Sequence, residues 1–469
     1  MSPAIPPLTV ALLTYNRLHY LEQSIAAILD QSFDAFELLV LDNGSSDGTA
    51  QFVLGLQDPR IRYVRNSRNI STVEFNCRSA YHLALGRRVI VTHDDDVMEH
   101  QMLERQMRFM DEHPEVRLVW TRVSDIDQDG QALLASDAEA GLDRVFAPGQ
   151  FISGFLRERL WPMPSGVMLE RAVLPRFYAV HACLGGSPGG RNTLETAGIE
   201  DVLMPARINR RHAVGYLDEP LLRRRVHTRQ FSHVASLSLP GVHLYRELGR
   251  IARGVPGLEA QILQCDAHTA RFTVQEAVTT QSARVVSKAL LAKLQKLAVG
   301  LQASVARAPD AFLAGLPVFL LAQLLFPGRY GCGLDALSAA SHPQATQCLL
   351  AWAQSRVVNP GASIMTGLEG RRVIIFGSAF VAALLILDAE KSGNQVVACI
   401  DSNANRQGQK MLGVPMHPLS WMAEHVQGDD VVIISSERDH EHYLEALIRQ
   451  HVRPSTTVLS WKALTGSHG

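Results

Sequence analysis

Residues 88–97 read RVIVTHDDDV, an apolar β-strand pattern followed by three adjacent carboxylates. Adjacent like charges repel each other. A divalent cation reverses that repulsion, because Mg²⁺ and Mn²⁺ prefer hard carboxylate oxygens. A second interpretation is a solvated acidic turn, with Asp96 capping a helix that follows it. The sequence on either side of this stretch helps to decide between the two.

The acidic stretch belongs to a region in which strand patterns alternate with helix patterns. Strands are predicted at residues 8–13, 36–41, 61–64, 88–92 and 116–120, and helices at 18–29, 46–56, 72–85 and 97–112. Strands separated by helical patterns of this length form β-α-β units and a mostly parallel sheet. Ligands of such sheets bind at the C-terminal ends of the strands.

Three groups of polar residues fall at those strand ends. They are Thr14-Tyr15-Asn16-Arg17, Asp42-Asn43-Gly44-Ser45 and His93-Asp94-Asp95-Asp96. A random scatter of polar residues would not favour one edge of the sheet. The pattern therefore predicts a binding site there.

Length and composition limit the remaining possibilities. A chain of 469 residues is expected to form about two or three domains. The net charge of -1 gives no electrostatic reason to expect a nucleic acid as the main ligand. The six cysteines include no CxxC pair, which argues against a structural zinc site and against a disulfide framework.

Two segments bear on the location of the protein. The first ten residues lack a basic segment leading into an apolar core, so we expect no signal peptide and a cytoplasmic protein. The longest apolar run, residues 311–326, is shorter than the ~18–20 residues of a membrane span and is interrupted by Pro317 and Gln323. It predicts a buried helix pair; docking on the inner face of a membrane is the alternative.

The C-terminal half divides into two patterns. Residues 236–365 read as helices, and residues 371–461 resume the β-α alternation, with strands at 373–376, 396–400 and 431–434. Gly377 is the only one of the three dinucleotide-binding glycines present, and Phe380 and Val381 would crowd a pyrophosphate at the helix start. We therefore expect that this domain has lost dinucleotide binding, although Asp401 stands where such folds contact ribose.

The N-terminal third resembles family 2 glycosyltransferases of the GT-A fold. The matching stretches are residues 10–17 (VALLTYNR), 39–49 (LVLDNGSSDGT), 91–96 (VTHDDD), 198–203 (GIEDVL) and 223–228 (RRRVHT). The resemblance covers about residues 8–233. The strands after residue 371 resemble the small Rossmann-like modules found beside sugar-modifying enzymes.

The resemblance implies an α/β fold class and three domains. These are a GT-A-type nucleotide-diphospho-sugar transferase domain at 1–235, a helical region at 236–365 and a Rossmann-like domain at 366–469. It implies a nucleoside-diphosphate sugar donor (UDP-, dTDP- or GDP-linked) and a glycan or lipid-linked acceptor. A peripheral membrane or protein partner would be contacted through residues 236–469.

The resemblance also implies roles for individual residues. A divalent cation (Mn²⁺ or Mg²⁺) would be held by Asp94, Asp96 and His227. The residues implied in binding the nucleotide-sugar are Thr14, Tyr15, Asn16, Arg17, Asp42, Asn69, Asp94 and Asp95. His227 could instead hold the diphosphate together with Arg224 and Arg225. Structural alternatives remain: Asp42 can hold the turn at Asn43-Gly44, Thr14 and Tyr15 can pack at the strand end, and His227 can belong to a solvated basic loop.

Catalysis is implied at residues 200–201. Asp201 would be the base that accepts a proton from the acceptor hydroxyl in a single inverting displacement, with Glu200 beside it. Both can instead be carboxylates that cap a helix start. Trp161 lies where the family builds its acceptor pocket, and it can stack on a sugar or pack in the core.

Two departures from the family and three rival functions stand beside this interpretation. Residues 69–76 lack the glycine and arginine that the family often carries there. Asn43 replaces a frequent second aspartate, which hints at a deoxysugar donor. A nucleotidylyltransferase would be expected to carry a glycine-rich loop after the first strand, and residues 14–17 have no glycine. A non-catalytic nucleotide- or glycan-binding scaffold and an oxidoreductase acting through residues 371–461 are the other rivals.

Overall fold

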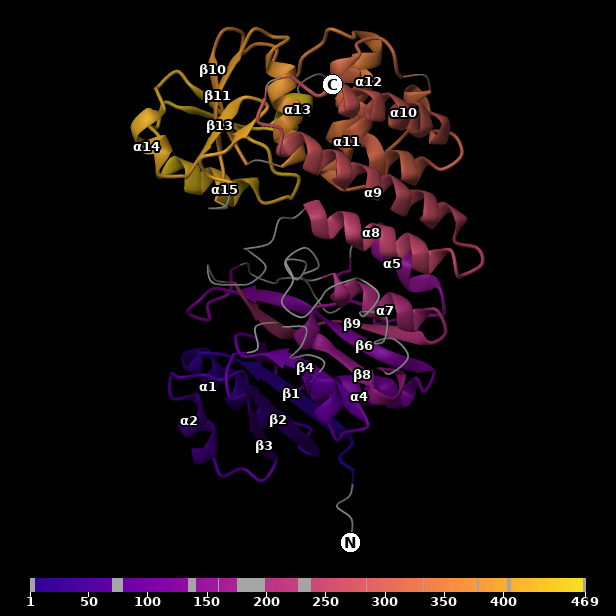
Figure 1. The fold of residues 1–469 in the computed structure, drawn as a ribbon, viewed down its shortest axis with the longest axis vertical. Coiled ribbons are helices and arrows are strands. Elements are labelled where there is room, and N and C mark those ends of the chain that lie inside the picture. The colour runs from indigo at the N-terminus through magenta and orange to yellow at the C-terminus, as the bar shows by residue number, and fades with distance from the viewer. Residues whose placement is uncertain are drawn as a thin grey trace. The chain divides into compact units, whose positions relative to one another are not determined.

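The computed structural model describes the chain apart from residues 1–4, 70–78, 134–140, 159, 175–198, 227–237, 284, 332, 378, 403–405 and 467–469. The chain forms two compact units. The N-terminal unit comprises residues 1–235 and 251–258, and the C-terminal unit comprises residues 236–250 and 259–469. Each unit is built around a β-sheet of its own (Figure 1).

The described part of the N-terminal unit contains a nine-stranded sheet. Its strands run in the order β3-β2-β1-β4-β8-β6-β9-β5, and β7 pairs with β9. The strands are β1 (Leu8–Thr14), β2 (Phe36–Asp42), β3 (Ile61–Arg65), β4 (Arg88–His93), β5 (Val97–Met98), β6 (Val116–Ile126), β7 (Arg144–Phe146), β8 (Val167–Glu170) and β9 (Ala213–Arg225).

This sheet is mixed, so the prediction of a mostly parallel sheet was wrong for part of its second half, where β6 and β9 are parallel but β5, β7 and β8 pair antiparallel. β3, β2, β1 and β4 are parallel neighbours, as the β-α alternation predicted. β8 then runs antiparallel to both β4 and β6. Its four residues are too few to show a period in sequence, and the pairing that defines it joins segments about eighty residues apart.

Helices cover the parallel half of the sheet on both faces. The helices of this unit are α1 (Leu18–Leu29), α2 (Thr49–Gly55), α4 (Met102–Glu112), α5 (Gln150–Glu158) and α7 (Glu200–Asn209). Val10 and Leu12 pack into one core with residues of α1, α2 and α4, whereas Ala11 and Leu13 pack into a second core that includes Ala80. Alternate strand residues thus face opposite layers, as the pleat requires.

The predicted helix at residues 97–112 begins five residues late. Val97 and Met98 form strand β5, paired with Arg223 and Leu222 of β9, and α4 starts at Met102. Both β5 residues are buried. Pairing with a distant strand therefore overrides the helical spacing of the local sequence, a tertiary effect that propensity does not capture.

The C-terminal unit has a six-stranded sheet of order β12-β13-β11-β10-β14-β15, parallel except for β12. Its strands are β10 (Arg372–Phe376), β11 (Gln395–Ile400), β12 (Lys410–Met411), β13 (Val414–His417), β14 (Val431–Ile434) and β15 (Thr457–Ser460). Its helices are α8 (Ser238–Ala252), which runs on into residues of the other unit, α9 (Glu259–Thr279), α10 (Lys288–Ser304), α11 (Pro309–Leu325), α12 (Gln344–Val358), α13 (Phe380–Ala389), α14 (Trp421–His425), α15 (Glu441–Arg449) and α16 (Trp461–Gly466).

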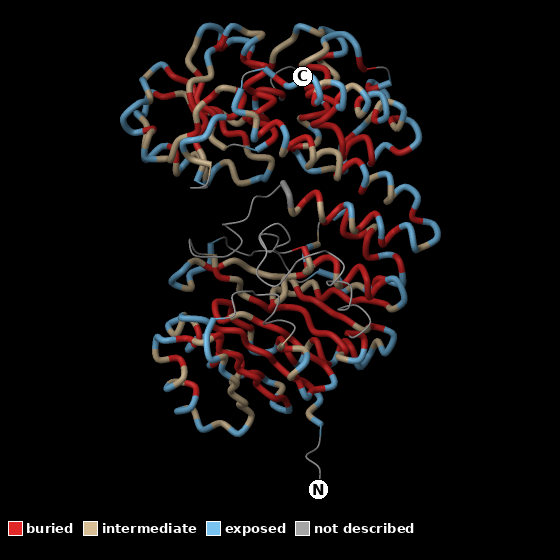
Figure 2. Tube along the Cα trace, viewed as in Figure 1, coloured by how far each residue is buried: buried red, intermediate tan, exposed pale blue. Residues whose placement is uncertain are grey.

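The apolar run at residues 311–326 is one helix, α11, not the predicted helix pair. Pro317 lies inside it, and residues 311–324 are all buried. The helical residues and one face of the C-terminal sheet share a single core, which Figure 2 shows as buried segments. No helix in the described part of the chain is long and apolar enough to span a bilayer.

Candidate active site

The parallel register brings the three polar groups to one edge of the N-terminal sheet. Thr14, the last residue of β1, is paired with Asp42 of β2, and Leu13 is paired with His93 of β4. Parallel strands end on the same side of a sheet, so residues 14–17, 42–45 and 93–96 follow three adjacent strand ends. The predicted clustering of these groups is confirmed.

The acidic turn is buried, so the interpretation as a solvated turn was wrong. Asp94, Asp95 and Asp96 are only 3%, 7% and 8% exposed. The Ser24 hydroxyl of α1 lies 2.8 Å from the backbone oxygen of Asp94 and 2.7 Å from that of Asp96. Helix α1 therefore holds the turn through Ser24. Asp96 does not cap α4, whose N-cap residue is Gln101.

Asp94 faces the end of β1. Its Oδ2 accepts a hydrogen bond from the Tyr15 N–H at 3.3 Å, and its Oδ1 accepts one from Arg17 Nη1 at 3.2 Å. The same Arg17 nitrogen lies 2.7 Å from Oδ2 of Asp95. Burial raises the pKa of the Asp94 carboxyl to about 6, although Arg17 opposes this shift. The positive charge of Arg17 thus compensates the burial of this carboxylate only in part.

Asp96 contacts other segments, namely the short turn before β8 and the last residue of β9. The Ser165 hydroxyl donates to its Oδ2 at 2.5 Å, and the Arg225 N–H donates to its Oδ1 at 3.3 Å. Burial, reinforced by the charge of Asp95, raises the pKa of the Asp96 carboxyl. The guanidinium of Arg225 donates to backbone oxygens, including that of Asp95, and lies over the ring of Tyr20.

Asp42 is almost completely buried and holds the turn that follows it. Its Oδ1 accepts the Ser45 N–H at 2.8 Å, and its Oδ2 lies 2.5 Å from the Tyr63 hydroxyl and 3.2 Å from Arg65 Nε. Gly44 has a φ of +84°, and a Cβ there would lie 2.8 Å from the carbonyl carbon of Arg68. Only glycine fits that close approach.

The other residues implied in nucleotide binding differ in what they contact. Thr14 is buried, whereas the Tyr15 side chain lies at the surface, 42% exposed. Asn16 adopts a φ of +52°; its N–H donates to the Ser45 hydroxyl at 3.0 Å, and its Oδ1 accepts the Ser46 N–H at 2.8 Å. Asn16 thus joins the end of β1 to the loop after β2.

Two further contacts tie these loops together. Asn69 Oδ1 accepts a hydrogen bond from Asn43 Nδ2 at 2.9 Å, so Asn69 braces the loop after β2. Asp47 Oδ2 accepts the N–H of Leu18 at 2.9 Å, and its Oδ1 accepts the Thr49 hydroxyl at 2.7 Å. Asp47 therefore binds the first turns of both α1 and α2.

Asp201 lies in the first turn of α7, beside Glu200. Trp161 forms a hydrogen bond with the Asp201 carboxylate, but burial outweighs it and raises the pKa of Asp201 to about 7. Trp161 itself is 41% exposed and packs on Phe155 with ring centroids 5.8 Å apart. Glu200 is paired with Arg207 at 2.7 Å. The two neighbouring carboxylates therefore differ: Glu200 is an ion-pair partner within the helix, and Asp201 titrates near neutrality.

Of the basic residues that follow, His227 lies outside the described residues. Arg224 forms a bidentate ion pair with Asp125, in which Nε lies 2.8 Å from Oδ1 and Nη2 lies 2.7 Å from Oδ2. Arg225 is 1% exposed, so its guanidinium faces the protein interior and not a ligand. The expectation that both arginines could hold a diphosphate therefore has no support from Arg225.

Ser165 and Ser24 are functional candidates that sequence reasoning missed. Both contact the acidic turn, yet they stand about seventy residues from it in the chain. Neither belongs to a recognisable motif. The only local signal for Ser165 was its place at the end of the segment that begins with Trp161.

The oxygen donors at the acidic turn suit a hard divalent cation. Among the described residues, no group of three or more His, Cys, Asp or Glu side chains is arranged around a common metal position. Asp94 and Asp96 are nonetheless buried carboxylates with raised pKa, which is the state expected of acidic groups short of positive charge. One or two carboxylates with substrate phosphates and water are the usual protein share of a Mg²⁺ site.

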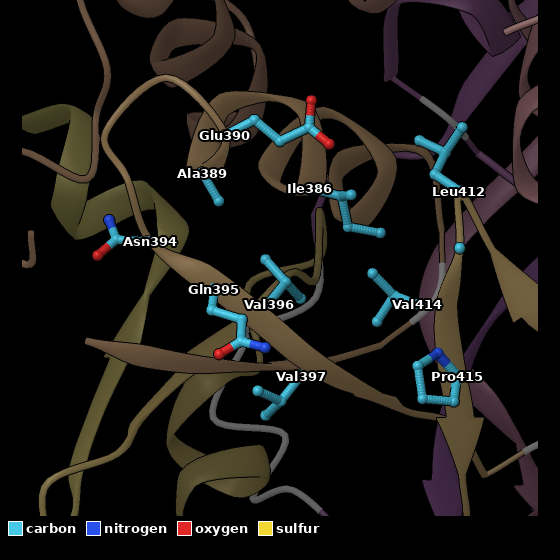
Figure 3. A pocket seen from close by; sticks show the side chains of 11 residues that line it. Ile386, Ala389, Glu390, Asn394, Gln395, Val396, Val397, Leu412, Val414 and Pro415 are labelled. Carbon is cyan, nitrogen blue, oxygen red and sulfur yellow. The ribbon is translucent and has the colours of Figure 1, made fainter. Parts of the chain in front are cut away.

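The corresponding edge of the C-terminal sheet is different. Gly377 follows β10 with a φ of +110°, and Phe380 and Val381 of α13 are fully buried in the core. A cavity of about 300 Å³ lies at the other end of the strands, lined by Glu390, Asn394 and Gln395 among others (Figure 3). The expectation that this domain has lost dinucleotide binding stays a prediction.

Comparison with known proteins gives a family for part of the N-terminal unit. The sequence model described as glycosyl transferase family 2 matches residues 9–168. A putative teichuronic acid biosynthesis glycosyltransferase of Bacillus subtilis is 32% identical over 130 residues, which are 27% of this chain and 51% of the relative. A GalNAc(5)-diNAcBac-PP-undecaprenol beta-1,3-glucosyltransferase of Campylobacter jejuni is 36% identical over 94 residues, 20% of this chain and 30% of the relative. The chain thus spans about half or less of the length of these curated relatives.

Solved structures give weaker likenesses. Residues 1–349 of TarS from S. aureus, in complex with UDP, are 18% identical with a TM-score of 0.41, covering 75% of this chain and 88% of that one. The mannosyltransferase PcManGT from Pyrobaculum calidifontis, in complex with GDP-Man and Mn²⁺, is 18% identical with a TM-score of 0.39, covering 76% and 88%. By the family match and the strand-end motifs together, residues 9–168 of this chain are a glycosyltransferase family 2 domain.

Proposed function

We propose that the N-terminal unit is a metal-dependent, inverting glycosyltransferase that moves a sugar from a nucleoside diphosphate to an acceptor hydroxyl. The observation that carries the proposal is the meeting of residues 14–17, 42–45 and 93–96 at one sheet edge, within the region that matches family 2. The candidate base is Asp201, in the first turn of α7 beside the exposed indole of Trp161, and burial raises its pKa to about 7. A base with a pKa near the operating pH is the group that this transfer requires.

The proposed chemistry is a single displacement. The acceptor oxygen attacks the anomeric carbon from the face opposite the diphosphate, and the bond to the leaving phosphate oxygen breaks with its electron pair. The Asp201 carboxylate accepts the proton of the attacking hydroxyl. Trp161, which contacts that carboxylate, fixes its orientation. The configuration at the anomeric carbon is inverted because the attack happens once.

The donor side is assigned to the strand ends. A divalent cation held by Asp94 and Asp96 would neutralise the charge that develops on the departing diphosphate. Asp42 is the candidate for the nucleoside, because its Oδ1 accepts one hydrogen bond, from Ser45 N–H, and a carboxylate oxygen can accept a second. The exposed ring of Tyr15 borders the same edge.

The acceptor is proposed to be a glycan or a lipid-linked sugar. Support comes from the relative named for an undecaprenol-linked glycan and from the one named for teichuronic acid biosynthesis. The donor nucleotide is UDP, dTDP or GDP; neighbouring structures were solved with UDP and with GDP-Man. A panel of nucleotide-sugars incubated with Mn²⁺, with released nucleotide measured, would identify the donor.

The substitution Asp96→Ala tests the proposal. We expect the Mn²⁺-dependent release of nucleotide to fall by a factor on the order of 100 or more, because removing a ligand of the cation leaves the leaving group's charge unneutralised. The circular dichroism spectrum should be unchanged. Asp58→Ala is the matched control, since Asp58 is paired with Arg60 just before β3, away from the acidic turn in sequence, and the substitution should leave turnover unchanged. Full activity of folded Asp96→Ala protein would overturn the assignment.

A further inference from the structure

We propose that Arg17 and the divalent cation compete for Asp94, so that cation binding turns Arg17 away from Asp94 and toward the donor diphosphate. This inference rests on the proposed function. It assigns to Arg17 the task of coupling the cation to the phosphates, and to Asp95 the task of keeping Arg17 near the site.

The contacts of Arg17 carry the first step. A single nitrogen, Nη1, contacts both Asp94 Oδ1 at 3.2 Å and Asp95 Oδ2 at 2.7 Å. A cation bound to Asp94 Oδ1 would be placed against that positively charged nitrogen. Like charges at such a distance repel each other, so Arg17 and the cation cannot share this oxygen at full strength.

The charges around the acidic turn carry the second step. Three carboxylates are buried here, and among the described arginines the charge of Arg17 is the one with ion pairs to Asp94 and Asp95. The charge of Arg224 opposes the rise in the pKa of Asp96, but the Arg224 guanidinium is paired with Asp125. The guanidinium of Arg225 donates to backbone oxygens, including that of Asp95. Arg17 is therefore the local charge that a cation would replace.

The backbone around Arg17 is fixed, so its side chain is the part that moves. Asn16 is tied by hydrogen bonds to Ser45 and Ser46, and the N–H of Leu18 is bound by Asp47. The Arg17 side chain is 29% exposed and stands at the start of α1. It can leave Asp94 by rotating about its own bonds, without any rearrangement of β1 or α1.

Asp95 gives the displaced guanidinium a pivot. Its contact with Arg17, at 2.7 Å, is the shorter of the two pairs. If Nη1 keeps its contact with Asp95 when Asp94 binds the cation, the guanidinium stays next to the acidic turn. Guanidinium groups bind phosphate oxygens through paired N–H donors, so the diphosphate is the partner that suits the displaced Arg17. Cation and diphosphate binding are then coupled through one side chain.

A calorimetric titration of Mn²⁺ into the full-length protein tests the competition without using activity. Removing the charge in Arg17→Met should tighten Mn²⁺ binding about tenfold, as expected for the loss of two partly exposed pairs. Arg17→Lys keeps the charge and should bind Mn²⁺ close to the wild-type affinity. Arg105→Met is the matched control: Arg105 is a similarly exposed, paired arginine of the same unit, but its partners are Glu219 and Asp143.

The outcomes separate this inference from the proposed function. Tighter Mn²⁺ binding by Arg17→Met alone supports the competition, and so does binding by Arg17→Met where the wild type shows none. Equal or weaker binding by Arg17→Met, with the folded state confirmed by circular dichroism, overturns the competition but leaves the cation site standing. If neither protein binds Mn²⁺, even with UDP, dTDP or GDP present, the cation site itself is wrong, and this inference falls with it.

Discussion

Two buried carboxylates, Asp94 in the N-terminal unit and Asp388 in the C-terminal unit, have the same perturbation and different surroundings. Burial raises the pKa of both. Asp388 lies at the end of α13, where its Oδ2 accepts the Ser363 hydroxyl at 2.5 Å and the Ile364 N–H at 3.1 Å. Arg356 of α12 stands 3.9 Å away, and both side chains of this pair are fully buried.

What differs is the access that a substrate would have. The Arg356 guanidinium donates to backbone oxygens of Gln323 and Pro360, so the pair joins α11, α12, α13 and the loop between them. Asp94 instead follows a strand end beside Tyr15 and Arg17, whose side chains reach the surface. A raised pKa therefore does not mark a functional site by itself, because structural ion pairs perturb titration as well.

The largest effect is expected from Asp201→Asn. Asparagine has the shape of the aspartate but cannot accept the proton, so the transfer rate should fall by roughly a factor of 1,000, within the range of general-base contributions. Initial rates of sugar transfer, with the identified donor at saturation, measure this. Asp401→Asn is the control from the other sheet, where an acidic residue also follows a strand end. An equal loss of activity in Asp401→Asn would break the contrast between the two sheets.

The next largest effect is expected in stability, from Arg356→Met. Removing one partner of a buried pair leaves the other charge uncompensated, which costs about 3–5 kcal/mol. The free energy of unfolding of the C-terminal unit should fall by that amount, measured by calorimetry. The double variant Arg356→Met, Asp388→Leu should recover most of the loss. If Arg356→Met abolished sugar transfer while the C-terminal unit stayed folded, Asp388 would be a functional carboxylate after all.

The sequence predicted much of this contrast because the informative signals are local. The buried parallel strands β1, β2 and β4 are continuous apolar runs, so their positions follow from composition and length. The polar residues at their ends follow in turn from strand direction. The broken glycine pattern at Gly377 is also visible in sequence, as is the apolar start of α13 at Phe380 and Val381.

The features that could not be predicted depend on pairing across long distances. β5 exists because Val97 and Met98 meet β9 more than 120 residues later, and β8 exists because it fits between β4 and β6. Ser165 reaches Asp96 for the same reason. Nothing in the local sequence of α13 shows that its Asp388 contacts Arg356. That contact depends on how α12 and α13 pack within the C-terminal unit.

The smallest effect is expected in the pH profile of activity, which depends on the raised pKa of Asp201. Asp201 must be ionised to accept a proton, and its pKa is raised to about 7. The value of kcat/KM, measured at saturating Mn²⁺, should therefore fall about tenfold for each pH unit below 7, or about 100-fold at pH 5.

Stability should respond to pH in the opposite direction. A carboxyl whose pKa is higher in the folded than in the unfolded state stabilises the fold at low pH, and that contribution is lost as pH rises from about 4 through 7. Asp201→Asn removes this titration, so the variant should be more heat-stable than the wild type at pH 8 and equal to it below pH 4. If the wild-type protein were as active at pH 5 as at pH 8, the pKa of the catalytic base would not be raised, and Asp201 with its raised pKa would not be that base. Another residue would then have to be the base.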